Sequence, residues 1–234
     1  MSNRFDDAIL RATTSLVGRS HTFDAWNLYV VGSPLFKGAT FVSIIWWFWF
    51  RRGDASVVRR TREHLTCTIM AGALSLVIAR GLAVLLPFRE RPRFDLNLPF
   101  PQLSDVLMNW SSMPSDHAVI FSALAIGIGF VSRVTGAGVF LYFLLAIAFP
   151  RVYLGVHYPT DIIAGVFLGS AVAHTFNSAR ARMVIAAPVL RWEQSAPSVF
   201  YAAFFMVCFQ VATLFDSLRA AAFWASHTAS RLLS

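Results

Sequence analysis

Residues 150–161 read PRVYLGVHYPTD and lie in the gap between two apolar runs. Within this stretch Arg151, His157 and Asp161 occupy positions i, i+6 and i+10. The apolar runs on either side predict helices, and the stretch predicts the polar connection between them. An arginine, a histidine and a carboxylate this close in sequence can together bind and react with an anion.

Two further polar clusters border apolar runs. Residues 113–117 read MPSDH and precede one run, whereas residues 89–93 read RERPR and follow another. Three clusters rich in arginine and histidine at such boundaries predict one anion site, assembled at one face of a membrane.

The composition indicates an integral membrane protein. Of the 234 residues 56% are hydrophobic and only 14% are charged, whereas soluble domains carry about 25% charged residues. The net charge of +8 comes almost wholly from arginine, because Lys37 is the only lysine. Arginines in short loops are signals of membrane topology, so we assign most of the surplus to topology and expect no nucleic-acid partner.

Apolar runs place the helices. A spanning helix needs about 20 mostly apolar residues, and Met1 to Ser20 lack such a run but fit a short amphipathic helix in the membrane interface. The predicted fold is an all-α integral membrane protein with about six transmembrane helices in a bundle. The expected spans are residues 28–50, 65–88, 117–133, 139–152, 160–177 and 198–218.

We expect a single membrane domain over residues 1–234. Its core, which bears the polar clusters, covers about residues 65–178. Peripheral helices fall within about residues 1–50 and 198–219.

The basic loops orient the chain. Segments 51–64, 133–137 and 178–197 each carry arginine and are therefore predicted to lie inside. Segments 89–116 and 151–159 then lie outside, so all three polar clusters share the outer face. A tight turn is expected at residues 135–138, which read TGAG.

His157 and Asp161 are the predicted reactive pair. At i and i+4 near a helix start they share a face, and a carboxylate on one ring nitrogen leaves the other as a nucleophile toward phosphorus. The alternative is an interfacial histidine capped by a helix-start aspartate. Arg151, Arg91 and Arg93 favour the first interpretation, because arginine clusters stabilise a transferring phosphoryl group. A patch that anchors lipid headgroups is the alternative for the 89–93 cluster.

His117 is the predicted general acid. A nucleophile on one side of phosphorus needs a proton donor for the leaving oxygen on the other side. Ser115 and the amides at the helix start add donors for an anion, and Asp116 could hold the ring of His117. The alternative for Asp116 is a plain helix cap.

The three clusters together resemble the signature of the type-2 phosphatidic acid phosphatase superfamily, whose pattern is KxxxxxxRP, PSGH and SRxxxxxHxxxD. Here the matching residues are Arg91-Pro92, then residues 114–117, then Arg151, His157 and Asp161. The match covers roughly residues 80–170.

This resemblance implies the role of each residue. His157 is the nucleophile, Asp161 orients it, and His117 is the acid for the leaving group. The phosphoryl group is bound by Arg91, Arg151 and Ser115. No metal ion or other cofactor is implied.

The chain departs from the family pattern at three positions. Pro150 replaces the serine of the third motif, Asp116 replaces the glycine of the second, and Val84 replaces the lysine of the first. Arg80 lies one helical turn from Val84 on the same face and is our first candidate to replace the lysine, because an arginine within a span is costly and usually functional. Arg89 and Lys37 are weaker candidates.

The Pro-Ser-Asp-His form and the N-terminal helix resemble the bacitracin-resistance type of undecaprenyl diphosphatase. That subfamily implies a polyprenyl diphosphate substrate among membrane lipids, hydrolysed at the outer face of a bacterial inner membrane through a phosphohistidine. Arg89 and Arg93 would suit a diphosphate. The alternatives are phosphatidylglycerophosphate, phosphatidic acid, phosphoryl transfer to lipid A, or a transporter or scaffold without catalysis. The oligomeric state stays open.

The remaining cysteines and histidines are predicted to be structural. Cys67 and Cys208 lie inside apolar runs without zinc-type spacing, so we expect two buried thiols. The histidines without a partner pattern are His21, His64, His174 and His227.

Overall fold

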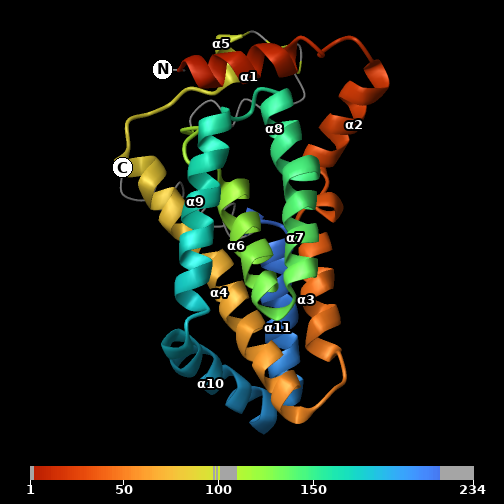
Figure 1. The fold of residues 1–234 in the computed structure, drawn as a ribbon, viewed down its shortest axis with the longest axis vertical. Helices are drawn as coiled ribbons and strands as arrows, with labels where there is room; N and C mark the ends of the chain where they lie inside the picture. Colours follow the sequence, from red (N-terminus) through yellow and green to blue (C-terminus); the bar gives the residue numbers. More distant parts are fainter. Residues whose placement is uncertain (1–2, 97, 99, 101–109, 217–234) are drawn as a thin grey trace, which may run out of the picture.

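A computed structural model describes residues 3–96, 98, 100 and 110–216, and every regular element within them is helical (Figure 1). In chain order the elements are α1 (Arg4–Thr14), α2 (His21–Gly32), the π-helical η1 (Leu35–Ala39), α3 (Thr40–Phe50), α4 (Ala55–Leu85), α5 (Pro92–Asp95), α6 (Asp116–Val131), α7 (Arg133–Tyr142), the π-helical η3 (Phe143–Ala148), α8 (Phe149–Tyr153), α9 (Pro159–Phe176), α10 (Ala179–Ser195) and α11 (Pro197–Ala212).

The chain is a multi-pass helical membrane protein, as predicted. Within the described residues two helices, Ala55–Leu85 and Arg133–Tyr153, are long and apolar enough to cross a membrane, and the number rises to four if two bent pairs each form one span. The shorter apolar helices α6 and α11 complete the set. These segments overlap the six predicted spans.

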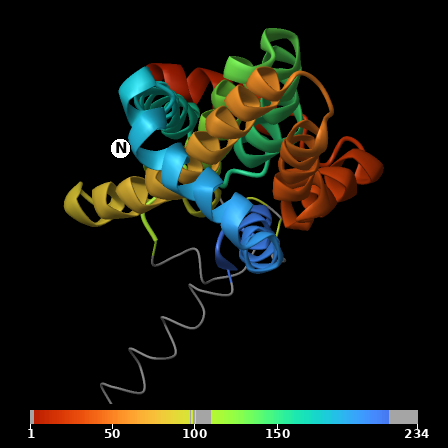
Figure 2. The ribbon, with the colours of Figure 1, turned by 90° about the horizontal axis from the view of Figure 1, so that it is seen from below.

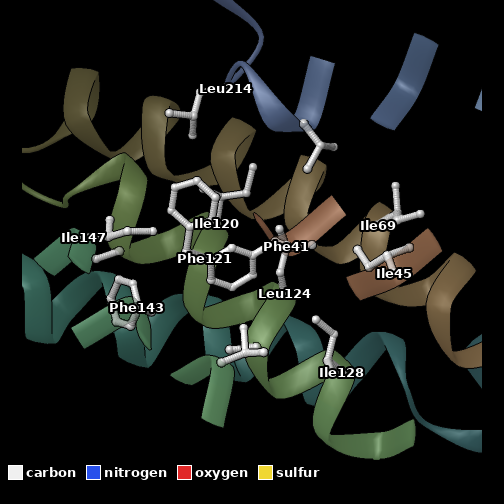
Figure 3. Packing of buried hydrophobic residues seen from close by; sticks show 14 of the residues in the cluster. Phe41, Ile45, Ile69, Ile120, Phe121, Leu124, Ile128, Phe143, Ile147 and Leu214 are labelled. Atoms are coloured by element: carbon white, nitrogen blue, oxygen red, sulfur yellow. The ribbon is translucent and has the colours of Figure 1, made fainter. Parts of the chain in front are cut away.

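The core is built around α6. This helix is apolar on all sides, which is typical of a helix surrounded by others. Phe121 of α6 packs on Phe41 of α3 with ring centroids 4.8 Å apart, and Ile147 of η3 and Ile69 of α4 belong to the same buried cluster (Figure 3). The burial of α6 fixes where its N-terminal residues lie, and these include His117.

The first predicted span is wrong in its start. Residues 28–50 were expected to be one helix, but α2 ends at Gly32 and meets the segment Leu35–Phe50 at 74°. Pro34 lies at the break, because proline lacks the amide hydrogen and clashes with the preceding turn. The bend leads into π-helical η1, which carries Lys37.

Two predicted loops are helical. Segment 51–64 belongs mostly to α4, whose 31 residues span about 46 Å at 1.5 Å per residue and so exceed a hydrocarbon core of about 30 Å. Segment 178–197 is α10, which crosses the base of the bundle at 73° to α9 (Figures 1 and 2). Both helices are stabilised by paired charges, since Arg62 of α4 contacts Glu193 of α10 at 2.5 Å.

The predicted turn at residues 135–138 is also wrong. Ser132 alone joins α6 to α7, and its hydroxyl accepts a hydrogen bond from the amide of Thr135. Gly136 lies within α7 and allows close packing instead: a Cβ there would lie 2.4 Å from the Cα of Gly129. The sequence predicts that Gly136 reverses the direction of the chain, whereas in the structure it allows α6 and α7 to pack closely.

The three polar clusters lie at one end of the bundle. The start of α6, the end of α8 and the start of α9 meet there, beneath α1 and α5 (Figure 1). The predicted N-terminal amphipathic helix is confirmed as α1. The start of α4 and all of α10 lie at the opposite end of the bundle.

Candidate active site

A cavity of about 210 Å³ opens at this end of the bundle. It gathers basic, acidic and imidazole groups from six parts of the chain. The residues that line it are Val31, Lys37, Arg80, Arg91, Ser111, Pro114, Asp116, His117, Arg151, Val156, His157, Leu214 and Asp216.

The segment between α8 and α9 presents His157 to this cavity. Gly155 has φ +65°, a left-handed conformation that favours glycine. A Cβ at this position would lie 3.0 Å from the backbone nitrogen of Arg93, and that nitrogen donates to the Gly155 carbonyl at 2.8 Å. The glycine therefore lets the 91–93 segment approach His157 closely.

Both nitrogens of His157 have defined neighbours. Nδ1 lies 2.8 Å from the carbonyl oxygen of Ser112 and 3.6 Å from Oδ2 of Asp161. Nε2 lies 3.3 Å from Nη1 of Arg91. Since a carbonyl only accepts, Nδ1 is assigned the proton and Nε2 the lone pair.

The surroundings keep His157 neutral. The pKa of His157 is lowered to about 4, chiefly by burial and next by the positive charge of Arg91, while Asp161 opposes the shift. Burial also lowers the pKa of Arg91, to about 10, so this guanidinium remains charged at neutral pH. A neutral imidazole beside a fixed cation is the arrangement that a nucleophile toward a phosphate anion requires.

Asp161 lies behind His157 and is held from two sides. Its Oδ2 accepts from the amide of Tyr158 at 2.8 Å, and its Oδ1 accepts from Nη1 of Arg89 at 2.6 Å. The nearest acceptor for His157 is thus the Ser112 carbonyl, and Asp161 adds a negative charge behind the ring. The sequence singled out Asp161 but gave no sign of the Ser112 carbonyl.

Arg89 and Ser115, which we expected to bind phosphate, do not line the cavity. The guanidinium of Arg89 contacts Asp161 and Asp6, each at 2.6 Å. The Ser115 hydroxyl caps α6 by accepting from the amide of Ala118, and the Ser115 amide donates to the Asp161 carbonyl at 3.2 Å. Ser115 thus holds the start of α6 in place, and Arg89 holds the start of α9.

Arg80 and Asp116, by contrast, do line the cavity and form an ion pair with each other. The guanidinium of Arg80 also lies over the ring of Trp110, 4.3 Å from its centroid, a favourable cation–π geometry. Asp116 therefore fixes a cation at the cavity wall. Lys37, the weaker candidate from the sequence, reaches the same cavity from η1.

Arg151 and Arg93 differ in placement. Arg151 is buried at the cavity wall, where Nη1 donates to the Ile147 carbonyl at 2.9 Å. Arg93 is not among the lining residues: it donates to the Phe100 carbonyl at 3.1 Å. The expectation that Arg89 and Arg93 would suit a diphosphate therefore finds no support in their positions.

Residues that the sequence analysis missed fall into two kinds. Ser111 and Asp216 line the cavity but belong to no motif. Gly165 and Gly169 lie in α9 where α6 crosses it, and a Cβ at Gly169 would lie 2.1 Å from the Val119 carbonyl oxygen. The four-residue spacing of small residues in an apolar helix is a known packing signal, which could have located this contact.

The groups predicted to be structural lie elsewhere. Cys67 and Cys208 are free and buried, which confirms the expectation of two buried thiols. His64 bonds Asn177 at 2.9 Å, and His174 bonds the Ser170 carbonyl at 2.8 Å. His227 lies outside the described residues.

Fold and cavity together define a helical membrane protein with two histidines and several cations around one cavity. The family model of the PAP2 superfamily matches residues 60–184. The chain therefore belongs to the PAP2 superfamily, as its motifs predicted.

Relatives with curated names share part of the chain. It is 31% identical over 129 residues to decaprenylphosphoryl-5-phosphoribose phosphatase from Mycobacterium tuberculosis, covering 54% of this chain and 66% of that protein. It is 25% identical over 170 residues to undecaprenyl-diphosphatase BcrC from Bacillus subtilis, covering 72% and 80%. A putative undecaprenyl-diphosphatase, YbjG from Escherichia coli, is 25% identical over 139 residues, covering 59% and 65%. No solved structure matches the chain.

Proposed function

We propose that this protein is a metal-independent lipid phosphatase that removes the terminal phosphate of a polyprenyl diphosphate such as undecaprenyl diphosphate. The observation that carries the proposal is the setting of His157: Nδ1 is anchored 2.8 Å from a carbonyl, and Nε2 lies 3.3 Å from Arg91 at a cavity shared with His117.

In the first step Nε2 of His157 attacks the terminal phosphorus. An N–P bond forms while the bond from phosphorus to the bridging oxygen breaks, and His117 transfers a proton to that oxygen. Lipid monophosphate leaves, and His157 carries the phosphoryl group. Arg91 and Arg151 stabilise the equatorial oxygens as charge develops on them.

In the second step water attacks the phosphohistidine. His117, now neutral, takes a proton from this water, the N–P bond breaks, and inorganic phosphate is released. Asp161 and the Ser112 carbonyl stabilise the imidazole while it bears the phosphoryl group, because a proton on Nδ1 then gives the ring positive character. Both histidines return to their starting states.

A diphosphate suits the cations that line the cavity. Lys37 and Arg80 supply positive charge in addition to Arg91 and Arg151, so two adjacent phosphates can be neutralised together. Asp116 acts here through Arg80, and Arg89 acts through Asp161, rather than by contact with phosphate.

The proposed location is supported by the distribution of arginine-rich segments between the two ends of the bundle. Arginine-rich segments mark the cytoplasmic side of membranes, and the cavity lies at the other end of the bundle (Figure 1). We infer that the site faces outward from a bacterial inner membrane, with the lipid tail in the bilayer and the headgroup in the cavity.

Phosphate release from undecaprenyl diphosphate in detergent micelles tests the proposal. We expect His157→Ala and His117→Ala to lower the rate by at least about 1,000-fold, since nucleophile and acid act as a unit, while His174→Ala at the surface keeps it. Vanadate should inhibit and EDTA should have no effect. Full activity of His157→Ala, or loss of activity with EDTA, would contradict the mechanism.

A second substrate is favoured by one observation, the 31% identity to a phosphatase named for a decaprenylphosphoryl phosphosugar. Its phosphate is a monoester, whose hydrolysis uses the same two steps. Comparison of kcat/KM for polyprenyl diphosphate, a polyprenyl-linked sugar phosphate, phosphatidylglycerophosphate and phosphatidic acid separates these substrates. Formation of lipid monophosphate that requires added lipid A, and that yields phosphorylated lipid A in place of free phosphate, would indicate transfer instead.

A further inference from the structure

Helix α1 brings a buried carboxylate to the back of the candidate active site. Asp6 is completely buried, and a buried charge is costly unless it is paired and hydrogen-bonded. Its Oδ2 accepts from Arg89 at 2.6 Å and from the Thr160 hydroxyl at 2.7 Å, and its Oδ1 accepts from the Thr160 amide at 2.9 Å. Of these two partners, Thr160 lies at the start of α9 and Arg89 lies just beyond the end of α4.

One guanidinium joins Asp6 to Asp161. Arg89 donates through Nη2 to Asp6 and through Nη1 to Asp161, each at 2.6 Å. Its planar group also lies over the Tyr158 ring, 4.1 Å from the centroid, which restricts its orientation. The charge of Arg89 is thus shared between two carboxylates, of which one lies 3.6 Å from Nδ1 of His157.

We propose that Asp6 is a positioning residue for the nucleophile, acting through Arg89 and Asp161. The inference rests on the proposed function and adds a residue from a helix outside the family match at residues 60–184. When Asp6 holds one side of Arg89, Asp161 keeps its place behind His157. Without the carboxylate of Asp6, the whole charge of Arg89 is directed to Asp161 and pulls it from the imidazole.

Attachment of α1 does not depend on Asp6 alone. Leu10 of the same helix is buried in the main apolar cluster, and this burial is favourable without any charge. Neutralising Asp6 should therefore leave the helix in place and disturb the geometry behind His157. A positioning role and a purely structural role can be told apart on this basis.

The decisive variant is Asp6→Asn in the full-length protein, assayed on polyprenyl diphosphate micelles. We expect kcat to fall about 10- to 100-fold, as for small displacements of reacting groups, with KM within about twofold because the cavity cations are untouched. Asp7→Asn on the same helix is the matched control and should keep wild-type kcat. Asp6→Glu restores the charge and should recover kcat to within about fivefold.

Coupling to Arg89 is tested by a double variant. If Asp6 acts through Arg89, then Asp6→Asn combined with Arg89→Gln should be no slower than Arg89→Gln alone. The proposal would be overturned if the two single losses of kcat multiplied in the double variant. It would also be overturned if folded Asp6→Asn kept the wild-type kcat. Should Asp6→Asn fail to fold, Arg89→Gln alone decides: reduced kcat at unchanged KM supports the proposal, and unchanged kcat overturns it. A wild-type protein without phosphatase activity would instead refute the proposed function.

Discussion

His157 gains its proposed role from neighbours that the sequence separates widely. Ser112 supplies the acceptor for Nδ1, and Arg91 supplies the cation beside Nε2. The motif predicted the histidine and its aspartate, but the carbonyl acceptor carries no side-chain signature. Sequence reasoning therefore predicted the candidate nucleophile and only one of the two groups beside its Nδ1 atom.

The lowered pKa of His157 predicts the pH dependence. In the proposed mechanism the neutral imidazole is the nucleophile, and a folded pKa of about 4 keeps it neutral at pH values where a histidine with the usual pKa of about 6.5 is protonated. The acidic limb of kcat/KM, which reports groups of the free enzyme, should thus lie near pH 4. If the acidic limb reports a group of the enzyme, it lies at the same pH for a diphosphate and for a monoester substrate. A limb near pH 6.5 with both substrates would contradict this prediction.

Lys37 is predicted to replace part of the lost motif lysine. Hydrogen bonds to charged groups contribute about 1.5–3 kcal/mol, so Lys37→Gln should lower kcat/KM for diphosphate about 10- to 100-fold, and more than for a monoester. Lys37→Arg should recover most of the activity, and Arg133→Gln at the opposite end should have no effect. Equal losses for both substrates would exclude a specific role toward the second phosphate.

At the scale of elements, the contact between α6 and α9 sets the distance between the halves of the site. Gly165 and Gly169 let the two helices approach until a Cβ would overlap the backbone of Val119. His117 lies in the first turn of α6, and His157 lies just before α9. The approach of these helices is thus a requirement for two histidines at one cavity.

Substitution of these glycines tests the requirement. Gly169→Ala places a Cβ 2.1 Å from a carbonyl oxygen, and overpacking of this kind costs about 1–3 kcal/mol. We expect a lower unfolding temperature and at least about tenfold lower kcat. The control is Gly138→Ala, because a Cβ there meets no atom within 4 Å. It should be neutral or slightly stabilising, since alanine favours helices. Destabilisation by Gly138→Ala would instead favour the turn that the sequence predicted there.

Over the whole molecule, charge is distributed between two ends. The starts of α6 and α9, next to the cavity, lie at one end, and the basic start of α4 and α10 lie at the other (Figure 1). This separation was expected from the positions of arginines, even though the segments that carry them are helices rather than loops. The positive charge rather than the local backbone determines orientation.

Cysteine labelling tests the orientation. A membrane-impermeant maleimide applied to spheroplasts should label Glu90→Cys near the cavity and leave Gly53→Cys, between α3 and α4, unmodified until the membrane is permeabilised. Cys67 and Cys208 are buried, so the unsubstituted protein provides a low background. The reverse labelling pattern would place the site in the cytoplasm and contradict the proposed location.

The sequence by itself determined the helical membrane fold, the positions of the apolar runs and the family, because hydrophobic length and motif spacing are properties of local sequence. Only the tertiary structure decided which cations line the cavity. Arg80 and Lys37 line it, whereas Arg89 and Arg93 lie outside it, and all four were plausible phosphate ligands by position in the chain. The direction of each side chain depends on partners far away in sequence: Asp6 holds Arg89, and Asp116 pairs with Arg80. Such pairings form only when the helices pack, so no local pattern reveals them.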